Sequence, residues 1–236
     1  MTFTVLGRCA RNGKTGYAQA TSTPAVGWRC TDVVPGYGVL TVQAHGDYRQ
    51  LQRAKALLQT GQSPEAILDT LRHEDPYFTY RQIALLLNDG RRAVNTGPKA
   101  RPWAGEIVGE HMIVSGNVLV GPQVLEAMAQ AWTRSVDAEL EERLLRCVEA
   151  GRDAGGQEEG QTSCALEVFD DRYTFPIVNL RIDVSLEPIA EMRKIFNWFQ
   201  PLIPYYIQRT LDPSAVAPKK AFLEQHGLPV NPYAPT

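Results

Sequence analysis

Thr2 has a side chain that could act as a nucleophile, and its position would give it a base as well. Aminopeptidases remove an initiator methionine when the next residue is small, so a mature chain would begin at Thr2 with a free α-amine. A hydroxyl needs a base within hydrogen-bonding reach. An α-amine has an unperturbed pKa of about 7.7–8.0, which suits a general base near neutral pH. One residue would then supply both groups, although the same residues would also suit an ordinary first strand.

Cleavage of an amide also requires N–H donors that stabilise the negative charge developing on the carbonyl oxygen. Two segments are candidates for this oxyanion hole. The segment TVQAHGD ends a predicted strand, so Gln43, Ala44, His45 and Gly46 would meet a substrate there, with backbone amides from 44–46 as donors. The segment SGNVLVGP offers the side-chain amide of Asn117. Each segment could equally be a simple turn or helix entry.

His45 is the histidine nearest to that strand end, and it could contact the substrate or transfer a proton. An amide hydrolase that activates water with His45 and a carboxylate is therefore an alternative, and a plain surface histidine is another. The other histidines have no metal-binding spacing, the four cysteines form no CxxC pair, and no glycine-rich phosphate loop occurs. We expect neither a metal nor a cofactor.

Composition restricts the possible partners. The chain has 236 residues with 24 Lys+Arg against 26 Asp+Glu, and this balance is unlike a nucleic-acid footprint or a polybasic membrane patch. Its apolar runs are far shorter than the roughly 20 residues of a membrane span, and no signal peptide is evident. Scattered cysteines suggest reduced thiols. We expect a cytoplasmic protein with a small-molecule substrate and with no nucleic-acid or membrane partner.

The elements that must position these residues alternate between strands and paired helices. Two runs of β-forming residues around Asn12-Gly13 predict a hairpin whose first strand begins at Thr2. Periodicity and turn residues predict further strands at 36–44, 80–88, 91–97, 161–170 and 176–184, and a pair of strands within 106–119. They predict helices at 48–60, 63–75, 122–134, 137–155 and 188–199. This order favours the α+β class, as two mainly antiparallel sheets packed face to face with helices outside each, a four-layer αββα sandwich.

The chain from Gln200 onward differs from the rest, because it holds seven prolines and has weak periodicity. We therefore expect one αββα domain over 1–200 and a Pro-rich C-terminal extension over 201–236 that packs on the domain or on a partner subunit. The stretch NWFQPLIPYYI is aromatic and apolar. It could cap the domain or form an interface between two copies, and we expect a homodimer.

Several segments together resemble the DUF1028 family. They are TFTVLGR, TGYAQATSTPAVG, YRQIALLLNDGRRAVNTG, WAGEIVGEHMIVSGNVLVGPQVLEAMAQAW, RLLRCVEAGRDAGGQEEGQTSCALEVF and LRIDVSLEPIAEMRKIF. They span about residues 1–200 in the family's order and leave the extension uncovered. The family is classed as similar to N-terminal nucleophile hydrolases, which have the αββα fold, so the resemblance implies Thr2 as nucleophile. Many relatives have Ser where this chain has Thr4, which makes Thr4 the second candidate.

The resemblance also implies roles for three matching positions. Arg8 would bind a substrate carboxylate. Ser22, beside the start of the first strand, and Asn117 would both belong to the catalytic group. The implied activity is hydrolysis of a linear or cyclic C–N bond in a small nitrogen-containing metabolite, in nitrogen catabolism. The alternative is a non-catalytic small-molecule-binding or assembly protein on the same fold, which retention of Met1 would favour. The stretch AHGDYRQL departs from the relatives, so their substrates do not transfer.

Overall fold

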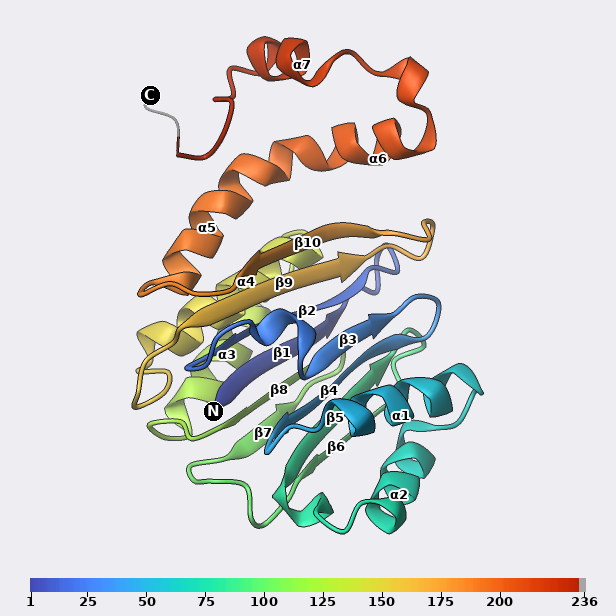
Figure 1. The fold of residues 1–236 in the computed structure, drawn as a ribbon, viewed down its shortest axis with the longest axis vertical. Coiled ribbons are helices and arrows are strands. Elements are labelled where there is room, and N and C mark those ends of the chain that lie inside the picture. Colours follow the sequence, from blue (N-terminus) through green and yellow to red (C-terminus); the bar gives the residue numbers. More distant parts are fainter. Residues whose placement is uncertain (234–236) are drawn as a thin grey trace.

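Two antiparallel sheets lie at the centre of the computed structural model, which describes residues 1–233 (Figure 1). Their strands are β1 (Thr2–Arg8), β2 (Thr15–Thr21), β3 (Thr31–Val34), β4 (Gly38–Ala44), β5 (Arg81–Leu87), β6 (Arg92–Thr96), β7 (Gly105–Val108), β8 (Met112–Asn117), β9 (Ser163–Phe169) and β10 (Pro176–Ile182). The first sheet has the order β10-β9-β2-β1-β8-β7, and the second has the order β3-β4-β5-β6.

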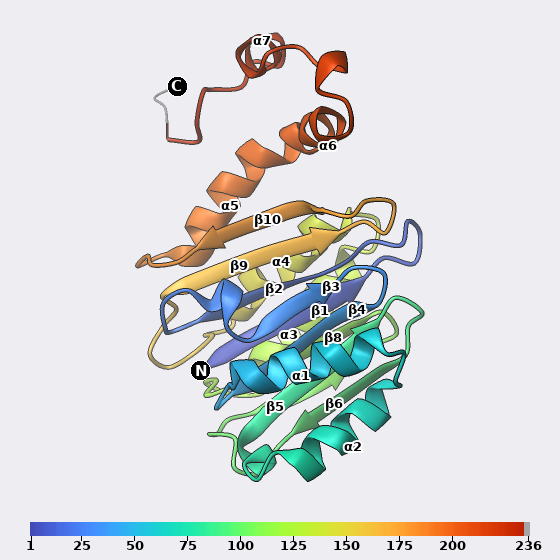
Figure 2. The same ribbon diagram turned by 45° about the vertical axis from the view of Figure 1, so that its right-hand side comes forward.

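Helices cover the outer face of each sheet (Figure 2). The helices are α1 (Tyr48–Gln59), α2 (Pro64–Glu74), α3 (Gln123–Arg134), α4 (Leu140–Asp153), α5 (Pro188–Phe199), α6 (Ile203–Leu211) and α7 (Lys219–Gln225). Apolar residues of α1 and α2 pack on β4 and β5, while those of α3, α4 and α5 pack on the first sheet. A third cluster fills the space between the sheets. The predicted αββα sandwich is therefore confirmed.

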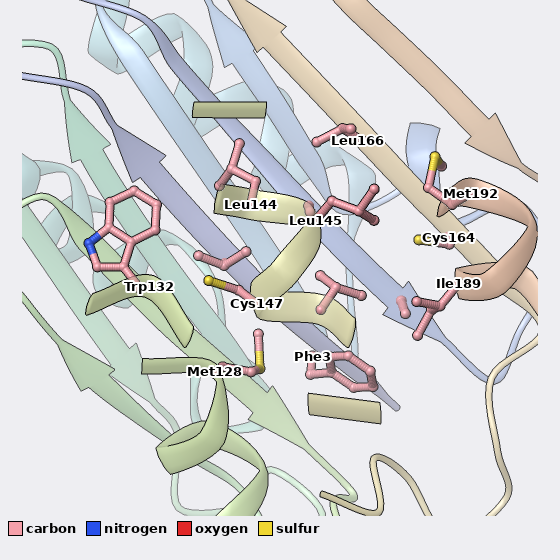
Figure 3. Close-up of a cluster of buried hydrophobic side chains, with 14 of the residues drawn as sticks. Phe3, Met128, Trp132, Leu144, Leu145, Cys147, Cys164, Leu166, Ile189 and Met192 are labelled. Atoms are coloured by element: carbon pink, nitrogen blue, oxygen red, sulfur yellow. The ribbon is translucent and has the colours of Figure 1, made fainter. Parts of the chain in front are cut away.

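Alternation along β1 decides which of its side chains face the second sheet. Phe3 and Val5 belong to the core under α3 and α4, where Phe3 lies near Met128 (Figure 3). Leu6 belongs to the core between the sheets. Because side chains alternate along a strand, Thr2 shares the inward face with Leu6. The hydroxyl of Thr2 is thereby directed between the two sheets.

The predicted N-terminal hairpin is confirmed, and its register sets the neighbours of Thr2. β1 pairs with β2 on one side, which places Thr2 opposite Thr21. It pairs with β8 on the other side, which places Thr2 opposite Asn117. Gly13 in the connecting turn has a φ of 73°, a left-handed conformation that glycine adopts without steric cost.

The C-terminal extension contains helices that its proline content concealed. Pro204 lies in the first turn of α6 and Pro218 is the residue before α7, positions that proline tolerates in a helix. Ile203 is buried in the core that contains α5. The rings of Tyr205 and Phe222, 4.6 Å apart, join α6 to α7. No helix within residues 1–233 has the length and apolar run needed to cross a bilayer.

Candidate active site

A cavity of about 340 Å³ lies beside the start of β1. Thr2 and Thr21 line it from the first sheet, and Gln43, Ala44 and Gly46 line it from the end of β4 in the second sheet. This volume is at the lower end of the range for small-molecule sites, about 300–1,000 Å³. The structure therefore brings Thr2 together with the predicted strand end of β4.

The hydroxyl of Thr2 lies on this cavity with one side-chain partner. Its Oγ1 donates a hydrogen bond to Thr21 Oγ1 at 3.2 Å, and Thr21 Oγ1 in turn donates to the backbone carbonyl of Met1. Thr4 is completely buried, and its hydroxyl donates to Gln43 Oε1 at 2.7 Å. Of the two candidate nucleophiles, only Thr2 lines the cavity.

A group of buried amides connects the two sheets beneath the cavity. Gln43 Nε2 donates to Gln82 Oε1 at 2.8 Å and to Ser115 Oγ at 3.3 Å. Gln82 Nε2 donates to the carbonyl oxygens of Gly105 and Gly116, each at 3.0 Å. Gln82 therefore holds β5 against β7 and β8. Buried polar groups that are fully hydrogen-bonded in this way specify one packing arrangement.

Asn117 faces this group in an orientation opposite to the expected one. Its Nδ2 donates to Gln82 Oε1 at 3.1 Å, while its Oδ1 is buried and has no hydrogen-bond partner among the described residues. Gln82 cannot be turned to reverse this arrangement, because its own Nε2 is committed to carbonyl acceptors. The group that Asn117 offers beside Thr2 is therefore an acceptor, whereas sequence analysis expected an N–H donor.

The backbone at the end of β4 leaves the strand conformation at Ala44, whose φ is 71°. A non-glycine residue rarely adopts this left-handed conformation, and such strain is concentrated at functional sites. Arg81 supports the turn, because its guanidinium donates to the carbonyl of His45 and to Asp75 Oδ2 at 2.9 Å. The N–H of Gly46 makes no hydrogen bond within residues 1–233, which leaves it available to a ligand.

Four predicted site residues do not line the cavity, namely Arg8, His45, Ser22 and Asn117. Arg8 is at the other end of β1, six residues from Thr2, which is roughly 20 Å at about 3.3 Å per residue. Its Nη1 lies 3.5 Å from Nδ1 of His111. His45 lines a separate cavity, where its ring meets that of Tyr80 edge-on. Ser22 follows the Thr2–Thr21 pair, and its hydroxyl is buried without a partner in the described structure.

Charge and burial around the cavity affect its ionisable groups. Burial lowers the pKa of the Met1 α-amine, and the nearby Arg101 and Arg29 lower it further, against the opposing effects of Cys30 and Glu159. Cys30 also lines the cavity, but burial raises the pKa of its thiol to about 11. The thiol is therefore protonated at neutral pH and is a poor nucleophile.

Sequence reasoning did not identify Trp28, Arg29 and Tyr48, which also line the cavity. Trp28 ends a short 3-10 helix and Arg29 follows it, in a segment without the periodicity that marks an element. Gln82 was also missed, although it is a polar residue inside the apolar strand RQIALLL. A buried polar residue of that kind is a sequence signal for an internal hydrogen-bonded group.

Comparison with known proteins gives a family and a fold. The model of a family of unknown function, DUF1028, matches residues 2–192. The crystal structure of protein SPO2555 from Silicibacter pomeroyi, which has the same family model, matches with a TM-score of 0.77 and 28% identity, over 84% of this chain and 89% of that chain. Anbu, the ancestral beta-subunit from Yersinia bercovieri, matches with a TM-score of 0.42 and 14% identity, over 87% and 97% of the two chains. No curated protein matches the chain.

Proposed function

The chain belongs to the DUF1028 family, and from the geometry at the start of its first strand we propose that it is an amidohydrolase with Thr2 as an N-terminal nucleophile. The substrate class is a linear or cyclic C–N bond in a small nitrogen-containing molecule. The observation that carries the proposal is that Thr2 lines the cavity, whereas Thr4 is completely buried with its hydroxyl bonded to Gln43.

In the proposed reaction, Met1 is first removed and the α-amine of Thr2 becomes free. Thr2 Oγ1 attacks the carbonyl carbon and passes its proton to the α-amine. The C–N bond then breaks, and the departing nitrogen takes that proton. Water attacks the resulting ester and gives a proton to the α-amine, and the acid leaves as the hydroxyl of Thr2 is restored.

Neighbouring residues suit the separate demands of this reaction. The unpartnered Oδ1 of Asn117 and the hydroxyl of Thr21 are acceptors that can hold the α-amine. The free N–H of Gly46, after the turn at Ala44, is a donor for the oxyanion. Burial and the nearby arginines lower the pKa of the Met1 α-amine, and the same surroundings would act on an α-amine at Thr2. A lowered pKa increases the unprotonated fraction that can act as base at pH 7.

We propose a homodimer, in which apolar residues of the extension such as Leu211 and Val230, both well exposed, meet a second copy. We also propose a cytoplasmic location, because all four cysteines are free and buried. A role in nitrogen catabolism follows from the proposed substrate class. Gel filtration with light scattering tests the dimer, and a monomer at micromolar concentration would contradict it.

A non-catalytic binding protein is the second candidate, and one contact favours it. The carbonyl of Met1 accepts a hydrogen bond from Thr21, so a retained Met1 has a defined place at the cavity. With Met1 in place the α-amine lies on the wrong residue, and the cavity would then bind a ligand without cleaving it.

Substitution of Thr2 separates the two candidates. We expect Thr2→Ala to lower turnover by several orders of magnitude and Thr2→Ser to retain part of it, because serine keeps the hydroxyl and the amine. The measurement is ammonia or amine release from a panel of linear amides, ureides and cyclic amides. His45→Ala is the matched control, and we expect it to remain active. If Thr2→Ala is as active as the parent, or if His45→Ala alone is inactive, the mechanism is wrong.

A further inference from the structure

Arg29 is the charged side chain that lines the cavity of Thr2, and its guanidinium lacks a full set of partners. It donates one side-chain hydrogen bond, from Nη2 to Thr23 Oγ1. Its Nε is buried and has no acceptor among the described residues. A buried N–H without an acceptor has lost its hydrogen bonds to water, which destabilises the folded chain by about 1–3 kcal/mol. Nη1 makes no hydrogen bond among the described residues and keeps some exposure, so it is the guanidinium nitrogen that a ligand in the cavity can reach.

No carboxylate offsets the charge of Arg29. None of the described residues that line the cavity is acidic, and Arg29 makes no ion pair within residues 1–233. Two arginines in neighbouring segments, which do not line the cavity, differ in this respect. Arg81 is paired with Asp75 at 2.9 Å, and Arg181, which lies against the Gly27 segment, is paired with Asp183 at 2.8 Å. The cavity therefore presents one unneutralised guanidinium.

Two large aromatic side chains share the cavity with Arg29. The rings of Trp28 and Tyr48 lie 5.8 Å apart and are 52% and 49% exposed. They come from separate elements, the 3-10 helix before β3 and the first turn of α1. Partly exposed aromatic rings beside a cavity are suited to contact with a flat or apolar part of a ligand.

We infer that this site takes substrates with a free carboxylate, which Arg29 binds, and with an apolar or flat group that packs against Trp28 and Tyr48. The class is the N-acyl or N-carbamoyl amino acids, whose carboxylate is a few bonds from the C–N bond to be cleaved. Hydrolysis of this class rests on the proposed function, whereas binding of the anion does not. Arg29 thus takes the role that the resemblance assigned to Arg8, because a guanidinium matches a carboxylate in charge and geometry.

Binding measured without turnover provides the test. The probes are N-acetylphenylalanine and N-carbamoylphenylalanine, each compared with its uncharged carboxamide by isothermal titration calorimetry on the Thr2→Ala protein. We expect the acids to bind at least about tenfold more tightly than the carboxamides, as a charge-assisted hydrogen bond allows. Arg29→Gln should abolish this preference and Arg29→Lys should retain part of it. Arg181→Gln, which removes a paired arginine nearby, should leave it unchanged.

The outcomes separate this inference from the proposed function. Acids that bind no better than carboxamides, an unchanged preference in Arg29→Gln, or no binding by either acid would overturn the role of Arg29. A preference that persists in the Thr2→Ala protein and requires Arg29 supports it, even if the parent hydrolyses neither acid. Conversely, a parent that hydrolyses the carboxamides as fast as the acids would uphold the amidohydrolase and refute the anionic substrate class. Circular dichroism of each variant confirms that it folds.

Discussion

At the scale of single residues, Thr21 is the side chain that touches the hydroxyl of Thr2, and its own hydroxyl is otherwise bonded to the carbonyl of Met1. Removal of Met1 takes away that second partner. The O–H of Thr21 then lacks an acceptor, and its oxygen, which accepts one hydrogen bond from Thr2, has a second lone pair that can accept from the charged α-amine. Thr21 is therefore a positioning residue for the proposed base.

Replacement of Thr21 tests this role. Valine has the same shape without the hydroxyl, so Thr21→Val should lower kcat by about 10–100-fold, the effect of one hydrogen bond to a charged group. KM should change little, and the basic limb of the pH–rate profile should move with the pKa of the amine. Thr21→Ser should restore most of the rate. Equal losses in the valine and serine variants would indicate a packing role instead.

Sequence predicted part of the site at this scale. Thr2, Ala44 and Gly46 line one cavity, and they could be singled out because a strand start and a strand end can be recognised from local patterns. Arg8 and Arg29 show the limit of that reasoning. Distance between residues depends on how the sheets pack, so the expected arginine lies at the far end of β1 while an arginine from an irregular segment lies at the cavity.

At the scale of elements, β9 carries Glu167, whose charged form is disfavoured by burial. Burial, aided by the charge of Asp32, raises the pKa of Glu167 to about 7, although Asn179 donates to its Oε1 at 2.9 Å. Below about pH 4.5 the group is neutral in both the folded and the unfolded chain. Between about 4.5 and 7 only the folded chain keeps the proton, so the free energy of unfolding falls as pH rises through this window. Above about pH 7 the folded chain holds the buried Glu167 in its charged form, and the free energy of unfolding has lost the whole of this contribution.

Glu167→Gln should remove that cost, because an amide keeps the shape and an acceptor without the charge. We expect the variant to have a higher Tm than the parent at pH 8, by about 2–4 °C, and nearly the same Tm at pH 4.5. Thermal unfolding followed by circular dichroism at several pH values measures the difference. Glu224→Gln, on the exposed side of α7, is the control. A Tm difference that does not depend on pH would refute the assignment.

Elements with a strong local signal were predicted well. The Asn-Gly hairpin and the helix predicted from residue 63, where Ser63 Oγ accepts from the amide of Ala66 at 3.2 Å, follow from neighbouring residues alone. β3 has only four residues, too few for alternation to be recognised. α6 and α7 were missed because their prolines lie at helix starts, where proline is tolerated, so proline content is a poor guide there.

At the scale of the whole molecule, the order of strand blocks and helix pairs was sufficient to predict the sandwich. An apolar sheet face must be buried against another element, so helix pairs that follow each strand block can cover the outer faces while the inner faces pack on each other. The polar group between the sheets was not predictable, since Gln43, Gln82 and Asn117 come from three strands that meet only after packing. Packing also decides the orientation of the Asn117 amide, which leaves its Oδ1 without a partner in the described structure.

The intact mass of the untagged protein, with a map of its N-terminal peptide, is the most direct test of the N-terminal mechanism. We predict a mass that lacks Met1 and an N-terminal peptide that begins at Thr2, with its α-amine free to act as base beside Asn117. A mass that retains Met1 in an otherwise active preparation would contradict the mechanism, because the base would then be attached to the wrong residue.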